Sequence, residues 1–327
     1  KFSGSLKLDY LRIRAVDPDL PGAQAQNNFQ LNWQFALDPK AAPTNSFSAN
    51  VSMASSSYNK ANGNTSVDIN STTNIVNTSF NSNINYSKTF SRAPFLYFSI
   101  AASHSQNVAT KQFSITFPLV RFGVQRVTPF KAKISSGKPK WYESIGLSYG
   151  FEAKNTLATY DSILFTNESL KRMRYGINQN VTIDAPFTLF KYLNVTPSAR
   201  YNERWYFQTI NKTWINKDQE IRTPGGQIIT IPGFASYLKT DTVTGFKAAR
   251  DFDASISFGT KVIGIYNFKG KYLKALRHIF TPQISAVYHP DFSTRFWGNY
   301  DSVRTNLYSK NQELYNRFDI VNSLYGS

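Results

Sequence analysis

The chain has 327 residues, of which 41% are hydrophobic, and it carries a net charge of +17. Cysteine is absent, which excludes a disulfide framework or a thiolate metal site within these residues. Charged residues make up only 17%, compared with roughly 25% in ordinary soluble domains, and asparagine, serine, threonine and glutamine supply the polarity instead. The basic excess indicates an anionic partner, which could be nucleic acid, acidic lipid or a phosphorylated glycolipid.

Alternation of polar and apolar residues with a period of two recurs along the chain and predicts strands with two unlike faces. No stretch shows comparable helical periodicity, and no run approaches the ~18 apolar residues of a membrane helix. The chain is therefore predicted to be all-β. The alternating stretches are residues 28–37, 77–90, 112–117, 144–151, 175–183 and 251–258.

Two architectures produce such alternation. A soluble sandwich or barrel buries its apolar face and turns its polar face to bulk water. A transmembrane barrel turns its apolar face to lipid and its polar face to a wet lumen. Three features favour the second architecture. The apolar faces carry large aromatic residues, and the polar faces carry uncharged amides. The strands also approach the ~9–11 residues that a tilted strand needs to cross a membrane. We therefore predict a large antiparallel transmembrane β-barrel.

This architecture assigns each parity of the alternating stretches to one side of the barrel wall. The lumen-facing candidates are Asn28, Gln30, Asn32, Gln34, Asn81, Asn83, Asn85, Ser114, Ser148, Asn178 and Asn180. The lipid-facing candidates are Trp33, Phe80, Ile84, Tyr86, Phe113, Ile115, Leu147 and Phe151.

Three similar segments begin with basic or aromatic residues and continue as an alternating strand that reaches a tyrosine. They start at residues 140, 190 and 276, and we interpret them as hairpins with basic and aromatic links, although coincidence in a low-diversity sequence is the alternative. Residues 208–247 form the longest segment without sustained alternation and are predicted to be a loop. Because bacterial barrels have short periplasmic turns and long external loops, we place the hairpin links in the periplasm and this loop outside.

A run of lysines precedes the strand at residues 144–151. Lys131, Lys133, Lys138 and Lys140 are candidate contacts for anionic groups, and a solvated turn is the alternative interpretation. Nucleic-acid binding would require basic and aromatic residues interleaved on one accessible face. Here the aromatic residues lie opposite the polar face, so we predict no nucleic-acid partner.

The sequence offers little material for catalysis. Its three histidines are His104, His278 and His289, and no second group converges with any of them. His104 and His278 share the parity of apolar neighbours, so both are expected at an interface. We predict no catalytic residue, no metal site and no cofactor, which argues against a barrel-borne hydrolase.

Several stretches resemble the lipopolysaccharide-assembly outer-membrane family LptD, in a divergent form with asparagine-rich strands. They are LNWQFALDPKAAPTNSFSANVSMASSSYN at residues 31–59, the segment from SHSQNV to FEAKN at residues 103–155, and RHIFTPQISAVYHPDF at residues 277–292. The last stretch is followed by YDS at residues 300–302 and NSLYG at residues 322–326, and together with YDS it is the strongest single match.

The resemblance implies a very large single barrel in the bacterial outer membrane that receives lipopolysaccharide from a periplasmic bridge and releases it into the outer leaflet. It also implies an LptE-like lipoprotein within the lumen. Residues 1–327 are expected to form the middle wall of such a barrel, truncated at both ends, without the family's N-terminal jellyroll domain and last strands. Bridge proteins would then dock on that missing domain. A general outer-membrane porin or transport channel is the alternative function, and a secreted β-adhesin is a further one.

Overall fold

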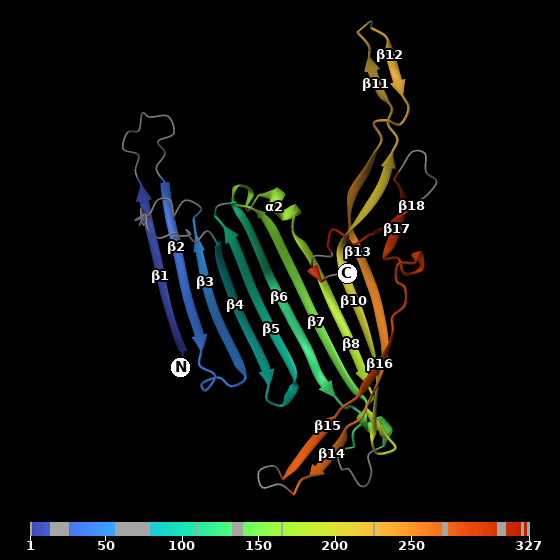
Figure 1. Cartoon of the computed structure of the whole chain (residues 1–327). Helices are drawn as coiled ribbons and strands as arrows, with labels where there is room; N and C mark the ends of the chain where they lie inside the picture. The colour runs from blue at the N-terminus through green and yellow to red at the C-terminus, as the bar shows by residue number, and fades with distance from the viewer. Residues whose placement is uncertain are drawn as a thin grey trace. The chain divides into compact units, whose positions relative to one another are not determined.

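The computed structural model describes residues 2–13, 26–55, 79–108, 110–132, 140–164, 166–224, 226–269, 274–305, 312–321 and 324–325. Antiparallel strands dominate these residues, which confirms the predicted all-β fold (Figure 1). The six alternating stretches lie in strands, apart from Asn77 and Thr78, which are outside the described residues, and Ser144 and Ile145, which end and follow a short 3-10 helix.

Most strands belong to one sheet of 12 strands. Its order is β1-β2-β3-β4-β5-β6-β7-β8-β10-β13-β16, with β9 paired to β10, and among the described strands this order does not close into a ring. The strands are β1 (Phe2–Ile13), β2 (Gln26–Leu37), β3 (Asn45–Ala54), β4 (Ser79–Phe90), β5 (Ala93–Asn107), β6 (Gln112–Val127), β7 (Gly146–Tyr160), β8 (Arg174–Asp184), β9 (Phe187–Leu189), β10 (Leu193–Ile215), β13 (Tyr237–Gly259) and β16 (Gln283–Tyr288).

Three separate hairpins and a few short helices complete the described structure. The hairpins pair β11 (Gln219–Arg222) with β12 (Ile228–Ile231), β14 (Val262–Asn267) with β15 (Ala275–Phe280), and β17 (Tyr300–Arg304) with β18 (Gln312–Asn316). The helices are η1 (Trp141–Ser144), η2 (Asp161–Ile163), α2 (Asn167–Lys171) and η3 (Arg295–Trp297). Within the described residues, no helix is long and apolar enough to cross a membrane.

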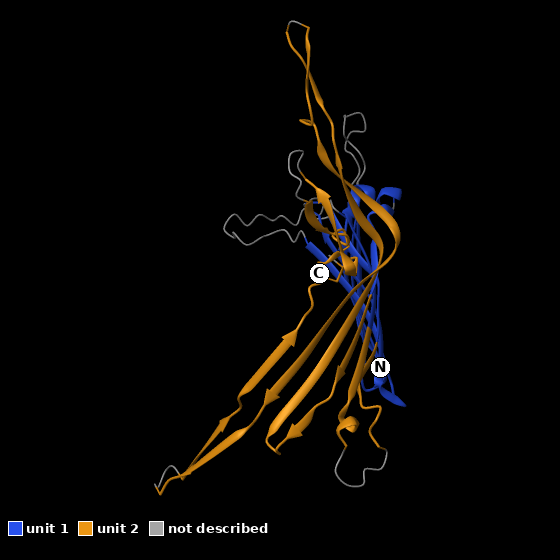
Figure 2. Cartoon of the chain, turned by 90° about the vertical axis from the view of Figure 1, so that its right-hand side faces the viewer, with its two compact units in different colours: residues 1–122, 151–177, 326 blue, residues 123–150, 178–325, 327 orange. Residues whose placement is uncertain are grey.

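The chain divides into two compact units, which Figure 2 shows in different colours. Unit 1 contains residues 1–122, 151–177 and 326, and unit 2 contains residues 123–150, 178–325 and 327. In unit 1, tight connections such as Ser91–Arg92 between β4 and β5 hold neighbouring strands in antiparallel register.

Unit 2 is built around the long pair of β10 and β13, each of 23 residues. Their pairing continues from Asn194↔Gly259 to Ile215↔Tyr237, with one irregularity between Tyr206 and Gln208. The prediction that residues 208–247 form a loop is therefore wrong, because residues 208–215 and 237–247 extend this strand pair and β11–β12 forms a further hairpin between them. Most side chains of residues 237–247 are exposed, so neither face imposes the alternation by which strands were recognised.

Candidate functional site

Polar side chains form a continuous row across five strands of unit 1. The register pairs Ser5 with Gln34, Gln34 with Asn50, Asn50 with Asn83, and Asn83 with Ser103. Directly opposed residues in antiparallel strands place their side chains on the same face. The pairing therefore brings together predicted lumen-facing residues of β2 and β4, which are far apart in sequence, on one polar face.

The neighbouring row on the other face contains small and apolar side chains. Phe35 pairs with Gly4 and Ala49, and Ile84 pairs with Ala49 and Ala102. Ile84 is one of the predicted lipid-facing residues, so the two predicted sets occupy opposite faces of β4. Which face meets lipid remains a prediction.

Hydrogen bonds link neighbouring strands on the polar face of unit 1. Ser52 Oγ donates to Asn32 Oδ1 at 3.0 Å, and Ser55 Oγ donates to Asn28 Oδ1 at 3.3 Å. Asn28 has no exposed surface. Because amides and hydroxyls both donate and accept, these side chains can bond to one another as well as to sugar hydroxyls or water.

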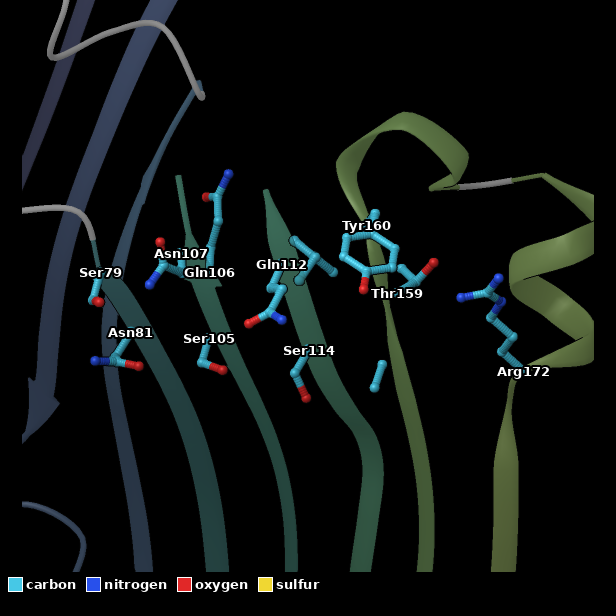
Figure 3. Close-up of a pocket in the computed structure, with 12 residues that line it drawn as sticks. Ser79, Asn81, Ser105, Gln106, Asn107, Gln112, Ser114, Thr159, Tyr160 and Arg172 are labelled. Atoms are coloured by element: carbon cyan, nitrogen blue, oxygen red, sulfur yellow. The ribbon is translucent and has the colours of Figure 1, made fainter. Parts of the chain in front are cut away.

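The polar face of unit 1 contains a hollow of about 610 Å³ at the end where β4 and β6 begin (Figure 3). Of the predicted lumen-facing residues it contains Asn81 and Ser114, and it adds Arg172 as a cation. No carboxylate is among its lining residues, so its polar groups are neutral or positive. The lining residues are Ser79, Asn81, Ser105, Gln106, Asn107, Gln112, Phe113, Ser114, Ala158, Thr159, Tyr160 and Arg172.

Arg172 reaches this hollow from the connection between β7 and β8. Thr166 caps the short helix α2 there, with its Oγ1 accepting from the Ser169 N–H at 3.4 Å, and Arg172 follows the last helical residue. Sequence reasoning missed Arg172 because nothing local to it indicates a site. It missed the β5 residues because that strand has an unbroken apolar run at residues 95–98 and ends in the wholly polar stretch SHSQN, so neither part alternates between polar and apolar residues.

His104 lies on the other face of β5, close to two side chains that the sequence did not connect with it. Its Nδ1 is 3.2 Å from Ser82 Oγ, and its ring centroid is 4.7 Å from that of Phe113. The Ser82 hydroxyl also bonds to both the N–H and the carbonyl of Ser52. Ser82 therefore joins two strands, which is a structural role. Phe80, a predicted lipid-facing residue, is buried nearby against Ala54.

The other two histidines lie in unit 2. His278 is exposed on β15, and the His289 ring lies 5.2 Å from the Phe292 ring, centroid to centroid. Within the part of the chain that the structure describes, no three histidine, aspartate or glutamate residues are grouped so that they could hold a metal ion.

An arginine clamp crosses β7 in unit 2. Arg126 on β6 donates to both carboxylate oxygens of Asp184 on β8, at 2.7 to 3.0 Å, and to the carbonyl oxygen of Ser144 at 2.9 Å. It passes over Gly146, where an added Cβ would lie 2.4 Å from Arg126 Nε. A larger residue here would require the guanidinium to shift from this position.

Asn180, a predicted lumen-facing residue, lies over a second glycine of β7. An added Cβ at Gly150 would lie 2.2 Å from Asn180 Oδ1. Gly146 and Gly150 share a parity, so the Arg126 clamp and Asn180 lie on the same face of β7. This face also carries Ser148, another of the predicted lumen-facing residues.

The polar face continues on β10 and β13 as a charged network. Asp251 accepts from Asn202 Nδ2 at 2.7 Å and forms an ion pair with Arg204 at 2.7 Å. These three groups help to line a hollow of about 620 Å³ within unit 2.

The segment that follows β16 covers part of this polar face. Phe318, Val321 and Leu324 pack with Tyr206 and Ala249 of the long strand pair, and Val321 is completely buried. Sequence reasoning did not predict this packing, because the segment shows no pattern of its own that would pair it with β10 and β13.

Of the four lysines predicted to contact anionic groups, Lys131 and Lys140 are exposed, while Lys133 and Lys138 lie outside the described residues. Lys140 Nζ lies 5.7 Å from the centroid of the Tyr142 ring. Neither of the two described lysines forms an ion pair within the described residues.

The geometry thus defines an all-β protein whose antiparallel strands separate an amide-rich face from an apolar one. The family described as LptD protein matches residues 1–327, and the chain belongs to this family. The family as a whole is associated with lipopolysaccharide transport at the outer membrane.

No curated protein sequence matches the chain significantly. Among solved structures, a double mutant of the Serratia marcescens hemophore receptor HasR, in complex with its hemophore HasA and heme, is similar over 81% of this chain at 12% identity and a TM-score of 0.27. The chain spans 36% of the length of that receptor.

Proposed function

We propose that residues 1–327 form part of the wall of one large outer-membrane barrel, which acts as the translocon that inserts lipopolysaccharide into the outer leaflet. The observation that carries this proposal is the family match over the whole chain, combined with a polar face that is continuous across five strands of unit 1. In this arrangement the polar face lines the lumen and the apolar face meets lipid.

The chemistry of the polar face suits a sugar-rich cargo. A lining of like charges would repel itself in a confined lumen, whereas amides and hydroxyls offer donors and acceptors without net charge. The hollow of unit 1, with Arg172 and no carboxylate, offers neutral hydrogen-bonding groups beside one cation. The net charge of +17 fits a cargo that carries phosphates and carboxylates.

A partner inside the lumen follows from the same reasoning. A barrel wide enough for this cargo would leak if its lumen were empty, so an LptE-like lipoprotein is expected to fill part of it. We place its contact on the row of Gln34, Asn50 and Asn83, whose amides can bond to a partner's backbone. Periplasmic bridge proteins would deliver lipopolysaccharide through a domain outside residues 1–327.

Site-specific photocrosslinking in cells tests the proposal. A photoreactive residue at Asn83 is expected to give adducts with a lipoprotein or with lipopolysaccharide. The adjacent position Ile84, on the lipid-facing side of the same strand, is the matched control and is expected to give no lipoprotein adduct, whereas lipopolysaccharide of the outer leaflet can reach it directly. Solvent-accessible lumen positions without any adduct would support an open porin and contradict the translocon role.

A further inference from the structure

The positive charge of unit 2 is concentrated at one end. The described parts of the three links at residues 128–145, 185–192 and 260–282 contain seven lysine or arginine residues and a single acid, Glu143. The extension of β10 and β13 at the opposite end, residues 208–246, contains four cations and three acids. In Figure 1, β14 and β15 mark the basic end and β11 and β12 mark the balanced one.

The cations at the basic end are available to a ligand. All seven that the structure describes have exposed side chains, and within the described residues none of them forms an ion pair. Arg126, at the end of β6, is by contrast held by Asp184. The seven are Lys131, Lys140, Lys191, Lys261, Lys269, Lys274 and Arg277.

Exposed aromatic side chains accompany these cations. Trp141, Phe190 and Tyr192 are 72%, 84% and 76% exposed, and all three lie in links of the basic end. Aromatic side chains at both membrane interfaces, beside lysines that reach the headgroups, are typical of membrane proteins.

The turn at Phe190 and Lys191 is the most informative feature of this end. Both residues have a positive φ, of 49° and 66°, and the Tyr192 N–H donates to the Leu189 carbonyl oxygen at 3.1 Å. This is the backbone of a type I′ turn, for which asparagine and glycine are strongly preferred. An aromatic residue and a lysine here oppose the backbone preference, so their side chains point to a function at the tip of the hairpin.

We propose that the basic end of unit 2 docks on the headgroups of anionic phospholipids in the leaflet beside the hairpin links. The link lysines would pair with lipid phosphates, while Trp141, Phe190 and Tyr192 lie at the boundary between headgroups and acyl chains. A juxtamembrane cluster of 4–8 lysines and arginines is the pattern expected for anionic lipid. The position of this end beside a leaflet rests on the outer-membrane location proposed above.

Matched charge variants test the docking. In the full-length protein purified in detergent, Lys131→Gln, Lys140→Gln, Lys191→Gln and Lys261→Gln are combined and compared with a control that combines Lys212→Gln, Lys217→Gln, Arg222→Gln and Lys239→Gln. Both lose four positive charges. The link variant is expected to lose affinity for phosphatidylglycerol by about fivefold per lysine, and the control is expected to bind like the wild type. Equal affinities of the two variants would overturn the proposal.

A second variant separates lipid binding from folding. Phe190→Asn combined with Lys191→Gly gives the turn its preferred residues, so the protein should fold at least as well as the wild type. Weaker binding of phosphatidylglycerol by this well-folded protein is expected, and unchanged binding would contradict a role of the tip in docking.

Other ligands give other outcomes. If the link variant loses affinity for purified lipopolysaccharide but not for phosphatidylglycerol, the cations serve the cargo and the lipid proposal is wrong. If the link variant binds phosphatidylglycerol normally but no longer copurifies with a periplasmic protein that the wild type binds, the basic end is a protein interface and the proposal is likewise wrong. Surface delivery of lipopolysaccharide is measured separately, so a failed lipid result with intact delivery leaves the translocon role standing.

Discussion

Unit 2 contains two kinds of cation, and the difference between them separates structure from function. On the polar face, Arg126 and Arg204 each bind an aspartate on another strand, at 2.7 Å in both cases. At the basic end, described lysines such as Lys131 and Lys191 are exposed and form no ion pair within the described residues. Paired charges stabilise the sheet, whereas unpaired exposed charges contribute little to folding and are free to meet a ligand.

The largest effect, on assembly of the barrel, is expected when a cation is placed on the apolar face. Ile84→Arg puts a guanidinium on the apolar face, which would cost about 2–4 kcal/mol near the bilayer midplane. We expect the variant to lose the heat-modifiable band of the assembled barrel on gels. Asn83→Arg, one residue away on the polar face, is the control and should assemble. If both variants assemble equally well, the assignment of the two faces is wrong.

Replacing the aspartate that pairs with an arginine should cause the next largest change, a loss of stability. Asp251→Ala leaves Arg204 and Asn202 without their common partner, at an expected cost of about 2 kcal/mol in the free energy of unfolding. The urea midpoint of the full-length protein in detergent measures this change. Asp241→Ala breaks the exposed pair with Lys239 and should leave the midpoint unchanged. Equal shifts in both variants would remove the distinction between structural and exposed pairs.

A smaller effect is expected from crowding the arginine clamp without removing any charge. Gly146→Ala places a methyl group against Arg126 and should cost about 1 kcal/mol, since overpacking forces side chains to shift. Gly259→Ala is the control, because its new Cβ would meet nothing nearer than the Pro282 carbonyl oxygen at 3.8 Å. The same urea titration compares them, and a Gly146→Ala variant as stable as the wild type would argue against the clamp.

The smallest change in stability is expected when the unpaired cations are replaced. Lys140→Gln combined with Lys191→Gln should change the free energy of unfolding by less than about 0.5 kcal/mol, because both side chains are exposed and make no ion pair. Arg126→Gln in the same background should lower stability clearly. A large loss of stability in the lysine double variant would show that these residues are structural after all.

The strands that sequence could predict are those with one face unlike the other. Residues 28–37 and 77–90 alternate because each face has its own surroundings, and both segments form strands wherever they are described. Residues 237–247 do not alternate, because both of their faces are largely exposed, so this half of the long pair was mistaken for a loop. Alternation with a period of two therefore depends on the surroundings of the two faces of a strand more than on the strand conformation itself.

The candidate site was predicted only in part, for a related reason. Asn81 and Ser114 belong to alternating strands, so sequence placed them on the polar face, and the structure adds Arg172 and Tyr160 to the same hollow. Arg172 reaches the hollow only because the connection between β7 and β8 folds back, and Tyr160 is the last residue of β7. The packing of Val321 on the polar face of unit 2 likewise depends on tertiary contacts that no local pattern reveals.

The glycine beneath Arg126 also limits how the strands can be assembled. If β7 slipped by one residue against β6 and β8, Ile145 or Leu147 would replace Gly146 at the crossing, and every side chain of β7 would change faces. A slip of two residues would keep the faces but would bring the Cβ of Ser144 or Ser148 into the space that the guanidinium occupies. The ion pair between Arg126 and Asp184 is therefore expected to disfavour alignments of β7 that are shifted by one or two residues.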